Sequence, residues 1–228
     1  EQRPPHVIGL SNYTWNEALN RFAGKEIKSG PSSDIPIIMG GPNIRLDDEG
    51  IASFLQDHAY VDRYVMYSGE RPMAEIIGTL LDMLPEKISG PQVRSLLLQR
   101  SHSLVDGHLG GGSIIDDEKD LDYVPSPYLS GALDEFLGGE FLPILETNRG
   151  CPFSCTFCVW GISALSKLKQ FSMERVKAEL NYVTGFGRLY SEIVYADANF
   201  GILKRDVEIA RYVRELHNEH KSFQAVQL

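Results

Sequence analysis

The sequence predicts an α/β protein built from two stretches of alternating strands and helices. Short apolar runs of strand length alternate with segments whose apolar residues recur at helical spacing, first in residues 6–84 and again in residues 141–228. A segment with weak periodicity and many turn residues separates the two stretches. Strands that alternate with helices pair in parallel, so each stretch predicts a sheet covered by helices.

The first stretch contains three predicted strands, each followed by a predicted helix. The strands cover residues 6–11, 35–41 and 63–69, and the helices cover residues 15–28, 49–58 and 75–84. The first helix follows a polar cap at Asn12 or Thr14 and has Trp15, Leu19 and Phe22 on one side. That apolar stripe predicts a side facing the core.

Residues 85–140 predict a linker. They include the glycine run 110–112 and the turn-rich segment 123–131, and one further strand is expected near residues 113–118.

The second stretch again alternates strand and helix. The predicted strands are residues 141–147, 191–197 and 223–228, and the predicted helices are residues 173–186 and 205–220. Neither stretch closes its own sheet, so we expect both domains to be truncated, with a first strand missing from the first one.

Composition excludes several classes of function. The chain has 228 residues, 43% of them hydrophobic, and a formal net charge of -9. The negative charge argues against nonspecific nucleic-acid binding, which depends on Lys and Arg contacts to phosphates. No apolar run is long enough to span a membrane, and the N-terminus lacks the basic start of a signal peptide. A cytoplasmic location is expected.

All three cysteines of the chain, Cys151, Cys155 and Cys158, lie within one short segment. An odd number of cysteines without an export signal argues against a disulfide framework. Structural zinc requires four ligands, and the chain has no second Cys-x2-Cys pair. Three thiolates on one loop favour an iron–sulfur cluster in which one iron stays open to a small molecule.

The segment ETNRGCPFSCTFCVW, residues 146–160, resembles the hallmark loop of the radical S-adenosylmethionine (SAM) superfamily. The resemblance implies that the three cysteines bind a [4Fe-4S] cluster and that SAM chelates its open iron. Reduction of the cluster would then cleave SAM to a 5'-deoxyadenosyl radical. In this superfamily the loop follows the first strand of a partial (β/α) barrel, and here it follows the predicted strand 141–147.

The same resemblance implies a SAM site next to the loop. Phe157 holds the aromatic position before the third cysteine, and Asp197 and Asn199 follow the next strand, where the superfamily contacts the SAM amino group. The triplet Gly138-Gly139-Glu140 matches a motif that many members use for that group. It lies before the cysteine loop, so we interpret it as a plain loop.

The first stretch resembles the cobalamin-binding domain fused to many radical SAM enzymes, and the likeness rests on residues that follow its three strands. Glycines there would let the backbone approach a bulky corrin, and polar side chains would bind the ring or its nucleotide tail. The residues that the resemblance implies as cobalamin-binding are Ser11, Trp15, Asn16, Gly40, Gly41, Pro42, Gly69 and Glu70.

One departure from the cobalamin-binding family is that the chain has no Asp-x-His-x-x-Gly segment to supply a histidine to cobalt. Either that segment belongs to a strand missing at the N-terminus, or the lower face of the cobalt has no histidine. Trp15 could pack against that face in the second case, and a place in the core is the other interpretation of Trp15.

The resemblance therefore divides the chain into a Rossmann-like cobalamin-binding domain (1–84), a linker (85–140) and the first part of a radical SAM barrel (141–228). It implies methyl transfer to an unactivated carbon or phosphorus centre of a small molecule or peptide, with flavodoxin or ferredoxin as electron donor. Two alternatives stay open. A methylthiotransferase acting on RNA or protein would need more cysteines, and a cobalamin-binding sensor would not need the cluster ligands.

Overall fold

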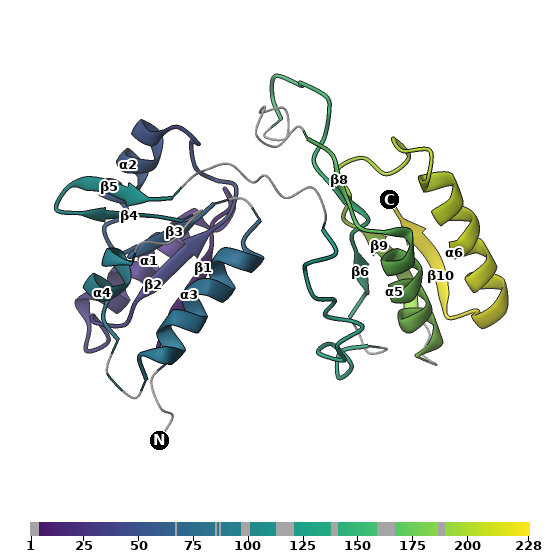
Figure 1. The fold of residues 1–228 in the computed structure, drawn as a ribbon, viewed down its shortest axis with the longest axis horizontal. Helices are drawn as coiled ribbons and strands as arrows, with labels where there is room; N and C mark the ends of the chain where they lie inside the picture. The colour runs from purple at the N-terminus through teal and green to yellow at the C-terminus, as the bar shows by residue number, and fades with distance from the viewer. Residues whose placement is uncertain are drawn as a thin grey trace. The chain divides into compact units, whose positions relative to one another are not determined.

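The computed structural model forms two compact units, residues 1–116 and 117–228 (Figure 1). It describes residues 5–66, 68–84, 86, 88–96, 101–112, 121–137, 141–158, 167–186 and 190–228. Within these ranges, none of the helices is both long and apolar enough to cross a membrane.

The first unit is a five-stranded sheet in the order β1-β2-β3-β4-β5. The first three strands are parallel and the last two join antiparallel. The strands are β1 (Ile8–Ser11), β2 (Ile37–Gly40), β3 (Arg63–Val65), β4 (Ser101–Val105) and β5 (His108–Gly111), and the helices are α1 (Glu17–Ser29), α2 (Asp48–Asp57), α3 (Glu70–Asp82) and α4 (Gly90–Ser95). The predicted order of strands and helices between residues 6 and 84 is confirmed.

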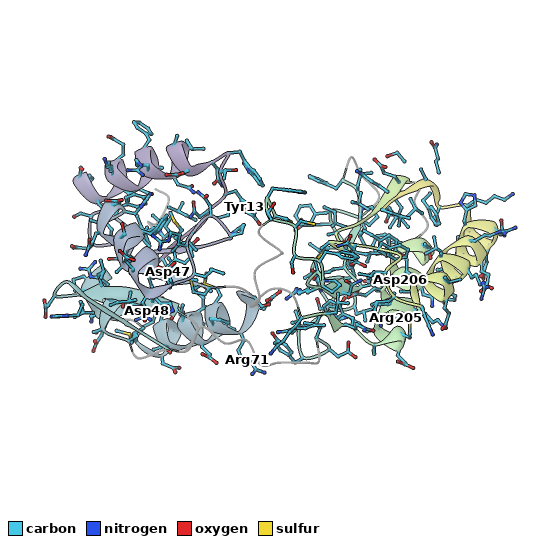
Figure 2. The ribbon with its side chains drawn as sticks, turned by 90° about the horizontal axis from the view of Figure 1, so that it is seen from above. Tyr13, Asp47, Asp48, Arg71, Arg205 and Asp206 are labelled. Carbon is cyan, nitrogen blue, oxygen red and sulfur yellow. The ribbon has the colours of Figure 1, made fainter. Side chains whose placement is uncertain are left out.

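Helices cover both faces of this sheet. Alternate residues of β2 face opposite sides, so Ile37 and Met39 pack with α2 and the end of α1, whereas Ile38 packs with α3 and α4. Asp47, labelled in Figure 2, caps α2 by accepting a hydrogen bond from the backbone N–H of Gly50 at 2.9 Å.

One expectation for the first helix is wrong, because its apolar side is exposed. Trp15, Leu19 and Phe22 are 78%, 67% and 66% exposed, so the stripe does not face the core of this unit. The opposite side of α1 packs instead through small residues such as Gly24, where an added Cβ would lie 2.1 Å from the ring of Tyr60. Because Gly24 has no side chain, α1 can lie in close contact with Tyr60.

Residues 101–111 also differ from the linker predicted there, because they form the hairpin β4–β5 at the edge of the first sheet. The hairpin gives only a weak apolar signal because its buried positions include Ser101 and Ser103. The buried guanidinium of Arg63 donates to the Ser101 hydroxyl at 2.9 Å and so satisfies it. The strand expected near residues 113–118 lies outside the described residues.

The second unit contains a parallel sheet in the order β6-β9-β10 and a separate two-stranded pair, β7-β8. The strands are β6 (Ile144–Leu145), β7 (Asn148–Arg149), β8 (Lys169–Gln170), β9 (Tyr190–Tyr195) and β10 (Phe223–Gln227), and the helices are α5 (Met173–Gly185) and α6 (Asp206–His220). The predicted alternation is confirmed, although the first strand is shorter than residues 141–147.

Part of the predicted linker packs into the core of the second unit. Leu121, Val124 and Tyr128 are buried in the same cluster as the apolar faces of α5 and α6. The Tyr128 hydroxyl donates to the carbonyl of Ile144 at 2.6 Å and accepts from its N–H at 2.9 Å. These two hydrogen bonds hold the start of β6 in position. Residues 121–137 are therefore a structural part of this unit.

Candidate functional site

The three cysteines lie on a loop whose two ends are joined by an antiparallel pair of strands. β7 precedes the loop and β8 follows it, so that Asn148 pairs with Gln170. The backbone N–H of Phe171 donates to the carbonyl of Thr147 at 3.0 Å and extends this closure. The loop is thus fixed at its base, beside the carboxyl end of β6.

The thiols differ in exposure. Cys151 is buried, Cys155 is exposed and Cys158 is intermediate, and none is in a disulfide. The backbone N–H of Cys158 donates to the carbonyl of Cys155 at 3.1 Å, which forms a tight turn. In the described part of the chain, which includes all three cysteines, no three His, Cys, Asp or Glu side chains gather as a metal site requires. The thiols fit an iron–sulfur cluster by number and softness.

Asp197, which follows β9, fixes the start of this loop. Its Oδ1 accepts from the backbone N–H groups of Thr147 at 2.6 Å and Asn148 at 3.2 Å. Its Oδ2 accepts from the Thr147 hydroxyl and, at 2.8 Å, from the Asn148 amide. Burial raises the pKa of Asp197, and these hydrogen bonds act in the opposite direction. Both oxygens are engaged within the chain, and contact with SAM stays a prediction.

Asn199 lies beside the first cysteine. Its side-chain Nδ2 is 2.9 Å from the Sγ of Cys151. Phe157, the third residue expected near SAM, is 92% exposed. The structure therefore brings Asn199 to the loop and leaves the Phe157 ring in solvent.

Sequence reasoning missed Arg205 and Asp206, consecutive residues at the start of α6 (Figure 2). The Arg205 guanidinium donates to the carbonyl of Thr147 at 2.7 Å and to that of Phe171, so it binds both flanks of the cysteine loop. Asp206 accepts from the N–H groups of Gly201 at 2.8 Å and Leu203 at 2.9 Å. An acidic residue in the first turn of a helix was the available signal for Asp206, whereas nothing in the sequence marks Arg205.

In the first unit, the residues expected to bind cobalamin meet at one edge of the sheet. β1, β2 and β3 are adjacent and parallel, so their carboxyl ends lie together. Ser11 and Gly40 end β1 and β2, and Gly69 precedes α3, whose first residue is Glu70. Gly41 and Pro42 directly follow β2. An added Cβ at Gly69 would lie 3.7 Å from the Val65 side chain, which is ordinary van der Waals contact.

Trp15 lies at this edge as an exposed residue, so its interpretation as a core residue is wrong. Its ring stacks on that of Tyr13, with centroids 4.5 Å apart and an angle of 14° (Tyr13 is labelled in Figure 2). Asn16 shapes the turn between β1 and α1, because its Oδ1 accepts from the N–H of Tyr13 at 2.8 Å and its Nδ2 donates to the carbonyl of Ser11 at 2.9 Å. The edge thus presents a flat aromatic surface beside a fixed polar turn.

The sequence does not predict a buried polar contact beneath this edge, because it marks Asn12 only as a candidate helix cap. The Asn12 amide donates to the Tyr64 hydroxyl at 3.1 Å, and that hydroxyl donates to the carbonyl of Gly41 at 2.7 Å. Gly41 has a φ of +134°, and an added Cβ would lie 2.3 Å from the Asn12 carbonyl oxygen. Gly41 is therefore required by the packing of the chain itself.

The triplet Gly138-Gly139-Glu140, interpreted as a plain loop, lies outside the described residues.

Known proteins match this chain over nearly its whole length, although no protein-family model matches it. The cobalamin-dependent radical SAM methyltransferase TokK of Streptomyces tokunonensis is 34% identical over 224 residues, which are 94% of this chain and 30% of TokK. The 2-(S-pantetheinyl)-carbapenam-3-carboxylate methyltransferase of Streptantibioticus cattleyicolor is 32% identical over 213 residues, 91% of this chain and 29% of that protein.

Among solved structures, the cobalamin-dependent SAM radical enzyme OxsB with aqua-cobalamin and SAM bound matches 97% of this chain and 30% of its own, with a TM-score of 0.63 and 20% identity. That likeness establishes the fold. The chain spans about 30% of the length of the curated relatives with which it shares a third of its residues. By its sequence the chain is similar to a segment of these methyltransferases, and by its fold it is similar to part of a cobalamin-dependent radical SAM enzyme.

Proposed function

We propose that this chain is the cofactor-binding portion of a cobalamin-dependent radical SAM methyltransferase that acts on a small molecule. The observation that carries the proposal is the three-thiol loop, clamped at the end of β6, in a chain that is 34% identical to a methyltransferase of this kind. The clamp supports it because a cluster ligand loop must be held on a rigid sheet to keep its sulfurs in place.

Cys151, Cys155 and Cys158 are the proposed ligands of a [4Fe-4S] cluster, and Phe157, Asp197 and Asn199 flank the proposed SAM site. With the cluster bound, SAM supplies a carbon radical that abstracts hydrogen, and cobalamin supplies the methyl carrier. The part played by this chain is to order the loop: Asp197 holds its first residues and Arg205 holds both flanks.

The proposed cobalamin site is the edge of the first sheet. Ser11, Trp15 and Asn16 form one side, after β1. The other side is formed by the turn Gly40-Gly41-Pro42 and by Gly69 with Glu70. The Trp15 ring supports this site, because it is 78% exposed and an exposed apolar ring gains free energy by covering a flat apolar ligand.

The proposed substrate is a small molecule with an unactivated carbon, because the name of one relative specifies a carbapenam carboxylate. That compound, 2-(S-pantetheinyl)-carbapenam-3-carboxylate, is the first candidate to test. Each methylation consumes two SAM molecules, one as radical source and one as methyl donor. It also requires two electrons, which flavodoxin or ferredoxin would provide.

Anaerobic reconstitution with iron, sulfide and cobalamin tests the proposal. The expected result is the charge-transfer absorbance of a [4Fe-4S] cluster, corrin bands that stay with the protein on gel filtration, and 5'-deoxyadenosine formation from SAM under reducing conditions. Cys155→Ala is expected to abolish SAM cleavage and leave cobalamin binding intact. The matched control is Ser154→Ala, on the same exposed part of the loop. A wild-type protein that takes up iron without cleaving SAM, or that releases all cobalamin, would contradict the corresponding half of the proposal.

A further inference from the structure

The Asn199 side chain has a contact that the proposed function does not use. Its Nδ2 lies 2.9 Å from the Sγ of Cys151, a buried residue that is 7% exposed. A thiolate ligand of iron can only accept hydrogen bonds, so the amide must present an N–H rather than its oxygen. Cys155 is exposed and has no comparable side-chain donor among the described residues.

The turn that carries Asn199 is fixed on both sides. On one side, Asp197 is bound by the N–H groups of Thr147 and Asn148. On the other, the buried carboxylate of Asp206 accepts from the N–H groups of Gly201 and Leu203. Between these two anchors the backbone has little freedom, so the Asn199 amide is aimed at Cys151 before any ligand binds.

We propose that Asn199 is a positioning residue that acts through Cys151: its amide N–H donates to this cluster ligand, orients the sulfur and raises the reduction potential of the cluster. A reduced cluster carries one more negative charge than an oxidised one, and part of that charge resides on the ligand sulfurs. A hydrogen bond to a ligand sulfur therefore stabilises the reduced state more than the oxidised state. This inference rests on the proposed function, because it requires a cluster on Cys151.

The test compares wild-type protein, Asn199→Leu and Asn199→Ser, each reconstituted anaerobically. Leucine keeps the approximate volume and removes the donor, whereas serine keeps a hydroxyl donor on a shorter side chain. Asn181→Leu is the matched control, because it makes the same substitution on α5, where the amide donates a hydrogen bond to the Tyr212 hydroxyl and not to a cysteine. The readouts are iron and sulfide content, the cluster midpoint potential from an electron paramagnetic resonance titration, and the dissociation constant of SAM.

At the wild-type midpoint, the ratio of reduced to oxidised cluster is expected to fall about tenfold in Asn199→Leu, which is about 59 mV for a one-electron couple. It should fall less in Asn199→Ser and stay unchanged in Asn181→Leu. An unchanged midpoint in a fully loaded Asn199→Leu protein would overturn the inference. Weaker SAM binding at an unchanged midpoint would also overturn it and would support the SAM contact expected from the sequence.

Two further outcomes separate this inference from the proposed function. If both Asn199 variants fold but take up no iron while Asn181→Leu does, the tuning role is wrong and Asn199 is required for assembly. A wild-type protein that takes up no cluster refutes the proposed function itself, whatever the variants do.

Discussion

Replacing Asp197 with alanine should loosen the base of the cysteine loop and destabilise the second unit. The carboxylate accepts four hydrogen bonds, all from Thr147 and Asn148, which are 0% and 1% exposed. At about 1 kcal/mol net for each bond the loss would be about 4 kcal/mol. Alanine also removes the cost of taking a carboxylate partly out of water, which offsets part of that sum, so we expect a loss of about 3 kcal/mol.

Two variants calibrate that loss. Asp197→Asn keeps an oxygen for the backbone N–H groups of Thr147 and Asn148 but faces the Asn148 amide with a second amide, so it should cost about half as much. Glu215→Ala, at an exposed position of α6, should change the free energy of unfolding by less than about 0.5 kcal/mol.

Urea denaturation followed by circular dichroism measures the free energy of unfolding. Hydrogen exchange measures the local effect, since the backbone N–H groups of Thr147 and Asn148 should exchange faster in Asp197→Ala than in wild type. If Asp197→Ala costs no more than Glu215→Ala and leaves both N–H groups protected, Asp197 does not hold the loop.

Three other substitutions test the first unit, each by urea denaturation. Burial raises the pKa of Tyr64 to about 12, so the native state keeps a proton that the unfolded state releases above pH 10. The free energy of unfolding of wild type should therefore fall by about 2 kcal/mol between pH 10 and 12, relative to that of Tyr64→Phe. Parallel pH profiles of the two proteins would refute this. Gly41→Ala should cost about 3 kcal/mol because Gly41 has a positive φ and lacks space for a Cβ. Gly9→Ala should cost nothing, because its added Cβ would meet no other described part of the chain within 4 Å. Equal stabilities of the two variants would show that the turn at Gly41 can relax. Arg63→Lys should cost about 3 kcal/mol, because one ammonium cannot replace guanidinium donors that bond both α4 and β4. Arg211→Lys, at an exposed position, is the control. Equal losses in the two variants would contradict a role for the buried hydrogen bonds of Arg63.

The sequence predicted α5 and α6 almost to the residue because their apolar positions recur at helical spacing and face one core. It missed β4 because the buried positions of that strand include the polar residues Ser101 and Ser103, and the guanidinium that bonds Ser101 belongs to Arg63 on another strand. It also misjudged Trp15, since helical spacing shows which residues share a side but not whether that side is covered in this part of the protein.

The candidate site divides along similar lines. The parallel order of the strands predicted that the site lies at their carboxyl ends. In the structure, Ser11, Gly40 and Gly69 lie at that edge of the sheet. The sequence did not predict the individual contacts, because hydrogen bonds such as that from Arg205 to Thr147 join residues far apart in the chain. No spacing rule reports a contact of that kind.

One turn, between β9 and α6, contacts the cysteine loop in three ways. Asp197 binds its first residues, Asn199 lies at its first sulfur, and Arg205 binds the carbonyls on both flanks. Because all three side chains come from one short connection, any shift of that connection alters the base of the loop and the surroundings of Cys151 together. The order of the ligand loop and the electronic environment of its first sulfur are therefore coupled through the same backbone, rather than set by the cysteine segment alone.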